Sequence, residues 1–386
     1  MTRDIPLGLY VHLPWCARKC PYCDFNSHAP RSVPPYAVYV DALLADLDAE
    51  RRECADALQG RAVHSVFFGG GTPSLFPPEQ IARLLAGIRA RLVLAADAEI
   101  TLEANPGAVE HGSFAALRAA GINRLSLGAQ SFDDARLAAL GRIHRSDETR
   151  AAFAEARAAG FANINLDLMY ALPGQDLAGA LADLDAALAL APEHLSHYQL
   201  TLEPGTPFAR TPPPALPDAD AAWAMQEACQ ARLAQAGYAQ YEVSAYARDG
   251  QQARHNLLYW TFGDYLGIGA GAHGKLSFPD GRIERRAKRR NPALYQQHAA
   301  DAQRLETHGA IATDELPFEF LLNALRLDAG VPLQLFTART GLAAAVLDAP
   351  LQRARADGLL DADPTRLRTT PRGARYLNDL LLYFMP

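Results

Sequence analysis

Three cysteines lie within eight residues near the start of the chain, in the segment HLPWCARKCPYCDFNSH, at Cys16, Cys20 and Cys23. The chain has five cysteines, and an odd, bunched set indicates a metal or cluster site in a reducing compartment rather than a secreted disulfide framework. Most iron-sulfur and structural zinc sites use four protein ligands. Either a fourth ligand comes from elsewhere, or one metal position is left open for another molecule.

Two kinds of site are compatible with three thiolates. A four-iron cubane held by three cysteines has one open iron, which can bind a small molecule. A structural zinc site of the Cys3His type would take its nitrogen from His12 or His28. A zinc site does not explain why polar and glycine-rich segments follow several other strands, so we favour the cluster.

Short apolar segments alternate with amphipathic Ala/Leu/Arg-rich segments up to about residue 200, which predicts strand and helix units and a parallel sheet. Polar or glycine-rich residues come at the end of nearly every predicted strand: GGGTPS at Gly69–Ser74, EANP, GAQSF and Asp167. Such ends converge on the mouth of a (β/α) barrel. We therefore expect an α/β fold with a partial (β/α)6 barrel and one large site. The predicted strands are 7–13, 63–68, 100–103, 124–127, 164–168 and 195–200.

The chain changes character beyond residue 205. Residues 203–220 are rich in proline and predict a linker, followed by a helix around 223–235, the β-prone YEVSAYA and the segment RHNLLYW. From about Thr313 amphipathic segments predict a helical, winged-helix-like unit; without a basic recognition helix, a lid or packing role is favoured over DNA binding. The predicted domains are 1–210, 211–310 and 311–386.

The overall charge favours no polyanionic partner. The net charge is −6 and only 21% of residues are charged, so we expect no nucleic acid. The basic run RIERRAKRR, 282–290, is predicted to be a solvated helix face, with docking at a membrane surface left open. The N-terminus lacks the pattern of a signal peptide, and no apolar window is long enough to span a membrane, so we expect a cytoplasmic protein. Cys54 and Cys229 are expected to be buried in helical stretches.

The ordered motifs carry a family resemblance. YVHLPWC, CPYCDF, FFGGGTPS, LEANP, LGAQSF, GRIHR and LDLMYALPG resemble the radical S-adenosylmethionine (SAM) superfamily, and more narrowly the oxygen-independent coproporphyrinogen III oxidase family and its close relatives. The resemblance covers about residues 5–210 and extends to the C-terminal unit. It implies a radical SAM barrel whose 4Fe-4S cluster leaves its fourth iron to the amino and carboxylate groups of SAM.

The resemblance also assigns roles. The three cysteines would hold the cluster. Glu103 can accept from an ammonium group, Arg142 can pair with a carboxylate, and Asp167 can bind a ribose hydroxyl. The positions that match contacts to one or two SAM molecules are Tyr10, Tyr22, Gly70, Gly71, Thr72, Glu103, Gln130, Arg142 and Asp167.

Two features favour the heme chaperones related to the oxidase over the oxidase itself. The oxidase has a fourth cysteine two residues after the third, where this chain has Phe25. The segment RHNLLYW resembles a His-Asn-x-x-Tyr-Trp motif of the chaperones, which offers an imidazole to heme iron and flat rings to a porphyrin. The predicted heme residues are His255, Asn256, Tyr259 and Trp260, with His12, His197 and His273 as alternative ligands.

We therefore expect a heme chaperone, with heme as cargo and a heme-acceptor protein as partner. Association into a dimer stays open. The alternative is the oxidase activity, in which SAM drives oxidative decarboxylation of coproporphyrinogen III. A simple electron-transfer or zinc protein is the third class.

Overall fold

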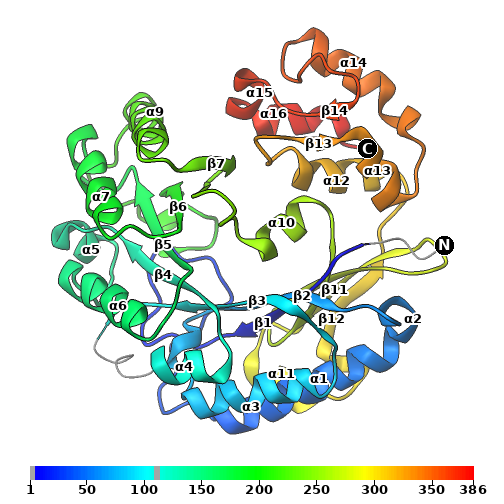
Figure 1. Cartoon of the computed structure of the whole chain (residues 1–386), viewed down its shortest axis with the longest axis horizontal. Coiled ribbons are helices and arrows are strands. Elements are labelled where there is room, and N and C mark those ends of the chain that lie inside the picture. The colour runs from blue at the N-terminus through cyan, green and yellow to red at the C-terminus, as the bar shows by residue number, and fades with distance from the viewer. Residues whose placement is uncertain (1–4, 108–113) are drawn as a thin grey trace.

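The computed structural model describes residues 5–107 and 114–386; Met1 to Asp4, part of the N-terminal segment discussed above, lie outside it. Six parallel strands stand side by side in sequence order, and helices cover the outer face of the curved sheet (Figure 1). The sheet does not close on itself and so forms the predicted partial barrel. The strands are β1 Leu7–Leu13, β2 Val63–Gly70, β3 Leu94–Ala104, β4 Arg124–Gln130, β5 Ile164–Tyr170 and β6 His194–Gln199.

The helices of this half form for local reasons. In α3, apolar residues recur at helical spacing and are buried, and α5 and α7 begin at Asp133 and Asp176, whose carboxylates accept from backbone N–H groups. No helix in the described ranges is long and apolar enough to cross a membrane. The helices are α1 Tyr36–Glu53, α2 Ala55–Leu58, α3 Pro78–Arg89, α4 Phe114–Ala120, α5 Asp134–Ala139, α6 Ser146–Ala158 and α7 Leu177–Ala189.

The middle section enlarges the same sheet at both edges. β9 pairs in parallel with β1, and β10, β11 and β12 follow it as antiparallel neighbours, while β8 and β7 extend the sheet beyond β6. The result is a sheet of twelve strands. The added elements are α8 Pro207–Arg210, α9 Ala219–Gln235, β7 Ala239–Glu242, β8 Ala245–Ala247, α10 Arg254–Trp260, β9 Asp264–Ile268, β10 His273–Ser277, β11 Ile283–Lys288, α11 Pro292–His298 and β12 Leu305–Ala310.

The C-terminal helices have a hydrophobic core of their own, around Phe320 and Phe336. They lie across from the barrel helices, with α10 between them and the sheet (Figure 1). A two-stranded ladder joins the helices, as expected of a winged-helix-like unit, although the domain limits at 210 and 310 stay a prediction. The elements are α12 Leu316–Ala324, β13 Val331–Pro332, α13 Leu333–Thr340, α14 Asp348–Ala356, β14 Arg366–Leu367, α15 Pro371–Arg375 and α16 Leu377–Leu381.

The prediction of a solvated helix face at 282–290 is wrong. These residues form β11, where Arg286 and Lys288 are buried against α1. A charged strand was not predicted because its charges are compensated by acidic residues more than 200 positions away, which the local pattern does not reveal.

A buried ion network joins α1 to the added strands. Arg304 donates to Asp46 at 2.9 Å, to Glu50 at 2.8 Å and to Glu53 at 2.7 Å, and Lys288 donates to Asp46 at 2.7 Å. Burial raises the pKa of Asp46, whereas the neighbouring cations lower the pKa of Glu50. Such a network holds only while its charges stay matched, because an unpaired buried ion is costly.

We expect Arg304→Met to lower the free energy of unfolding by about 3–5 kcal/mol, since it leaves buried carboxylates with too few cations. Urea unfolding followed by circular dichroism measures the change. Arg83→Met is the matched control: Arg83 pairs with Asp41 on the surface, and we expect a change of less than about 1 kcal/mol. Equal losses in the two variants would show that the network does not carry this stability.

Candidate cluster and cofactor site

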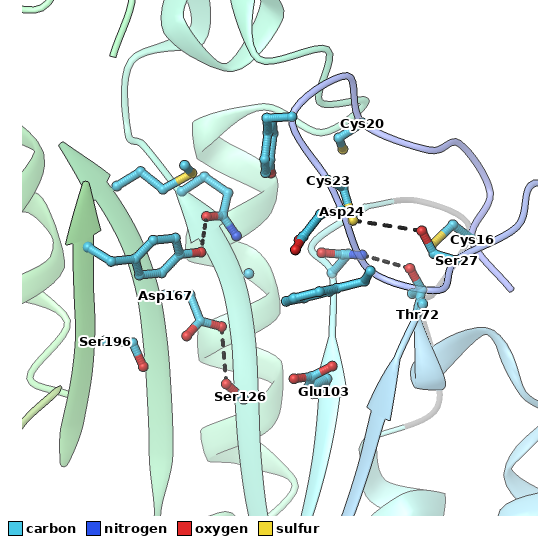
Figure 2. A pocket seen from close by; sticks show the side chains of 18 of the residues that line it. Cys16, Cys20, Cys23, Asp24, Ser27, Thr72, Glu103, Ser126, Asp167 and Ser196 are labelled. Carbon is cyan, nitrogen blue, oxygen red and sulfur yellow. Dashed lines mark hydrogen bonds between the residues drawn. The ribbon is translucent and has the colours of Figure 1, made fainter. Parts of the chain in front are cut away.

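A cavity of about 740 Å³ lies at the carboxyl ends of the parallel strands. We call it the cluster cavity. Figure 2 shows the cysteine loop at one end of it and Ser126, Asp167 and Ser196 at the other, with Glu103 between them. The predicted site residues that line it are Cys16, Cys20, Cys23, Tyr22, Gly70, Gly71, Thr72, Glu103, Gln130, Arg142 and Asp167.

The cysteine loop presents its thiols to this cavity from a fixed base. Cys16 N–H donates to the carbonyl of His28 at 2.9 Å, and His28 N–H donates to the carbonyl of Pro14 at 2.7 Å, so the two ends of the loop are tied together. Burial raises the pKa of the Cys16 and Cys23 thiols; hydrogen bonding with Thr72 opposes this rise at Cys16, and hydrogen bonding with Ser27 opposes it at both thiols. A bound metal centre would stabilise the thiolate forms.

The donor set fits a cluster. Within residues 5–107 and 114–386 no three His, Cys, Asp or Glu side chains are grouped to hold a metal ion. The cysteines of a four-iron cluster bind different iron atoms, and three thiols from one loop facing one cavity supply this kind of donor set.

The glycine turn after β2 serves close packing. A Cβ on Gly70, whose φ is 117°, would lie 2.5 Å from the ring of His12, and one on Gly71 would lie 2.6 Å from the carbonyl oxygen of Trp15. The backbone N–H groups of Gly70, Gly71 and Thr72 are engaged within the protein, because they donate to Glu103, Leu13 and Trp15. The turn thereby seats the cysteine loop against β2.

Two carboxyl groups give the cluster cavity its electrostatic character. Burial and the nearby Asp167 raise the pKa of Glu103 to about 8, although Gly70 N–H donates to it at 3.2 Å. Burial also raises the pKa of Asp167, despite hydrogen bonds from Asn165 and Ser126. A cationic ligand would favour the ionised form of both groups, which agrees with the ammonium and sulfonium groups of SAM.

Arg142 reaches the cluster end of the cavity. It donates to Asn105 Oδ1 at 2.5 Å, to the carbonyl of Gly128 at 2.8 Å and to Cys20 Sγ at 3.8 Å. Gln130 adopts a φ of 66° at the end of β4 and accepts from the Tyr198 hydroxyl at 2.8 Å. Such strain in a non-glycine residue is often found at functional sites, because the surrounding structure must enforce it.

A second cavity, of about 600 Å³, adjoins the first and shares Phe25, Gly70 and Glu103 with it. We call it the aromatic cavity, because Tyr10, Tyr259, Trp260 and Tyr265 line it together with Phe25. Asn323 of α12 lines the aromatic cavity and Arg326 the cluster cavity. The C-terminal unit thus supplies wall residues to both cavities.

Only two of the four predicted heme residues lie on a cavity wall. Tyr259 and Trp260 line the aromatic cavity, while His255 and Asn256 line neither cavity. His255 is 1% exposed, and both of its ring nitrogens are engaged, Nδ1 with Ser65 Oγ at 2.8 Å and Nε2 with the Tyr259 hydroxyl at 2.8 Å. This histidine therefore holds α10 on β2 and orients Tyr259.

Tyr10, unlike the other predicted SAM residues, does not line the cluster cavity; it lines the aromatic cavity together with Gly70 and Glu103, and its hydroxyl contacts His12 Nδ1 at 3.0 Å. Sequence reasoning missed Arg290 as a wall residue and the role of Glu99, which accepts from the first N–H groups of α10. Arg290 was hidden inside the basic run. No local signal links Glu99 to a helix that begins 155 residues later.

Comparison with known proteins agrees with this geometry. The radical SAM superfamily model matches residues 10–187, and the HemN C-terminal domain model matches 311–376. The solved structure of Escherichia coli coproporphyrinogen III oxidase (HemN), described as a radical SAM enzyme, is 26% identical, with a TM-score of 0.83 over 99% of this chain and 90% of that one. Fold and site together are those of a radical SAM protein.

Relatives that match over the full length identify the family within the radical SAM proteins. The heme chaperone HemW of Escherichia coli is 50% identical over 100% of both chains, and that of Haemophilus influenzae is 47% identical over 100% of this chain and 99% of its own. The chain belongs to the heme chaperone HemW family.

We expect Glu103→Gln to stabilise the cluster-free protein in a pH-dependent way. The pKa of Glu103 is raised to about 8 in the folded state, so unfolding releases a proton at intermediate pH. The stability of the parent therefore falls, relative to the variant, as pH rises from about 4.5 to 8, by at most about 1.4 kcal/mol per pH unit. Above pH 8 the difference should be constant.

Urea unfolding at pH 5, 6.5, 8 and 9 measures this difference. Asp167→Asn is the companion variant: because Asp167 raises the pKa of Glu103, its removal should move the window to lower pH. A stability difference between parent and Glu103→Gln that is the same at all four pH values would contradict the assignment.

Proposed function

We propose that this chain binds heme in the aromatic cavity and passes it to an acceptor protein, while the adjoining cluster cavity holds a SAM-coordinated 4Fe-4S cluster. The observation that carries the proposal is the pair of adjoining cavities, one with thiols and carboxyls and the other with aromatic rings. Identity over the full length to proteins named heme chaperones supports it.

On the cluster side, Cys16, Cys20 and Cys23 would hold the cluster, which supplies an open iron for the amino and carboxylate groups of SAM. Glu103 lies where it can accept from the ammonium group, and releases its proton when it does so at neutral pH. Asp167 and Arg142, fixed by their own hydrogen bonds, provide a hydroxyl acceptor and a positive charge.

On the heme side, the rings of Tyr259 and Trp260 offer flat apolar surface to a porphyrin. Trp260 is held from behind by the Arg326 guanidinium, 4.4 Å from the ring centroid, and Tyr259 is held by His255. A cavity of about 600 Å³ is within the usual range for cofactor-sized ligands.

Phe25 is the residue that favours the heme chaperone over the oxidase. It is 59% exposed and lines both cavities, at the position where the oxidase has a fourth cysteine. We propose that the chain does not decarboxylate coproporphyrinogen III. The oxidase remains the second candidate, supported by the structural similarity to HemN over nearly the whole chain.

The thiol chemistry supports a reducing compartment such as the cytoplasm. The charges of the basic run 282–290 serve the fold rather than a membrane contact, because Arg285, Arg286 and Lys288 pair with acidic residues of the chain itself. We propose that the acceptor is a hemoprotein that has not yet received its heme.

The test is a hemin titration of the anaerobically reconstituted full chain, followed by absorbance. We expect saturable binding, and we expect Trp260→Ala to weaken it at least about tenfold, equivalent to about 1.4 kcal/mol, because an aromatic wall is lost. Trp223→Ala is the matched control, since Trp223 packs under Arg375 and lines neither cavity. Absence of saturable binding by the parent would refute the proposal.

An anaerobic assay with coproporphyrinogen III, SAM and a reductant distinguishes the second candidate. We expect no protoporphyrinogen and no substrate-dependent 5'-deoxyadenosine. Formation of both products would identify the chain as an oxidase.

A further inference from the structure

The aromatic cavity has two histidines among its described lining residues, His12 and His273. His12 is 4% exposed, and its ring nitrogens are engaged, Nδ1 with the Tyr10 hydroxyl and Nε2 with the carbonyl of Asn26 at 2.9 Å. An imidazole ligates iron through a nitrogen that is free to approach the metal. His12 would have to break one of these contacts to do so.

His273 lacks such contacts. It is the first residue of β10 and is exposed, and its ring nitrogens have no hydrogen-bond partner within the described ranges. It lies two residues before Lys275 on β10, so the two side chains share a face of the sheet. Lys275 is opposite Tyr265 of β9, so His273 and Tyr265 also lie on the same face. Both residues line the aromatic cavity.

Arg290 supplies a positive charge to the same cavity. It lies just beyond β11, its side chain is exposed, and it forms no ion pair in the part of the chain that the structure describes. The other basic residues near this end of β11 are engaged: Lys288 with Asp46 and Glu50, and Arg289 with the carbonyl of Gln303. Arg290 is therefore free to pair with an external carboxylate.

These groups together match the chemistry of heme. A free imidazole suits the iron, aromatic rings suit the macrocycle, and a guanidinium suits a propionate. We propose that His273, and not His255, is the axial ligand of the heme, and that Arg290 pairs with a propionate. This inference rests on the proposed function and specifies where and how its cargo is held.

His255 then acts as a positioning residue. For iron to bind it, either Ser65 or Tyr259 would have to give up its hydrogen bond, and the ring, which stacks on Phe67 at 5.1 Å between centroids, would have to leave the core. In its present position it fixes the Tyr259 hydroxyl and, through α10, the indole of Trp260. The segment RHNLLYW contributes walls rather than the iron ligand.

The experiment compares hemin binding by the reconstituted parent, His273→Ala, His255→Gln and His308→Ala. Absorbance and electron paramagnetic resonance report the axial ligand, and the titration reports affinity. We expect His273→Ala to lose the parent's Soret position and at least tenfold in affinity, and added imidazole to restore the spectrum. His255→Gln should weaken binding but leave the spectrum of bound hemin unchanged.

His308→Ala is the matched control, because His308 is an exposed histidine of β12, in the same sheet, and lines neither cavity. For Arg290, hemin is compared with its dimethyl ester: Arg290→Gln should weaken hemin at least fivefold and leave the ester unaffected.

The outcomes separate the two proposals. If the parent binds no hemin, the proposed function fails, and this inference fails with it. If the parent binds hemin but His273→Ala keeps both its spectrum and its affinity, the inference alone is overturned. A change of spectrum in His255→Gln, with none in His273→Ala, would identify His255 of α10 as the iron ligand and overturn the inference.

Discussion

The position of β1 between β2 and β9 determines where every part of the site lies. Its register sets Leu13 opposite Gly70 and Val11 opposite Ile268. The cysteine loop leaves the end of β1 and packs on the glycine turn of β2, where a Cβ on Gly71 would lie 2.6 Å from the backbone of that loop. Because β9 lies on the other side, the aromatic cavity is built next to the cluster cavity and shares a wall with it. A sheet that ended at β1 would have no second cavity.

The two cavities offer different groups to a ligand, although they share Glu103. The cluster cavity contains two carboxyl groups whose pKa values burial raises, and these favour a cationic ligand. The aromatic cavity has Arg290 and His273 on its wall, and these suit an anionic, iron-containing ligand. Neighbouring parts of one sheet therefore suit two different ligands, a cationic one in the cluster cavity and an anionic one in the aromatic cavity.

The sequence predicted the elements whose signals are local. Alternating strand and helix patterns located all six parallel strands, and Cys16 and Glu103 were correctly expected at strand ends. Asp167 lies in the middle of β5, because this strand continues to Tyr170, but it still lines the cluster cavity. The joining of β9 to β1 could not be predicted, since the partners are separated by about two hundred and fifty residues and the strand is short. The charged strand β11 was wrongly expected to be a helix, because Asp46 and Glu50, which neutralise it, lie on a distant helix.

The histidine of the His-Asn-x-x-Tyr-Trp segment shows why a residue type alone does not define its role. An imidazole beside two aromatic residues resembles a heme ligand in sequence, yet its two nitrogens can be satisfied by any pair of hydroxyl groups the fold brings near. Ser65 comes from β2 and Tyr259 from the next turn of the helix. Since a buried polar ring without partners is costly, these contacts account for His255 without a metal. The histidine that lines the aromatic cavity beside the same rings without hydrogen-bond partners in the described ranges, His273, is the one we propose as the ligand.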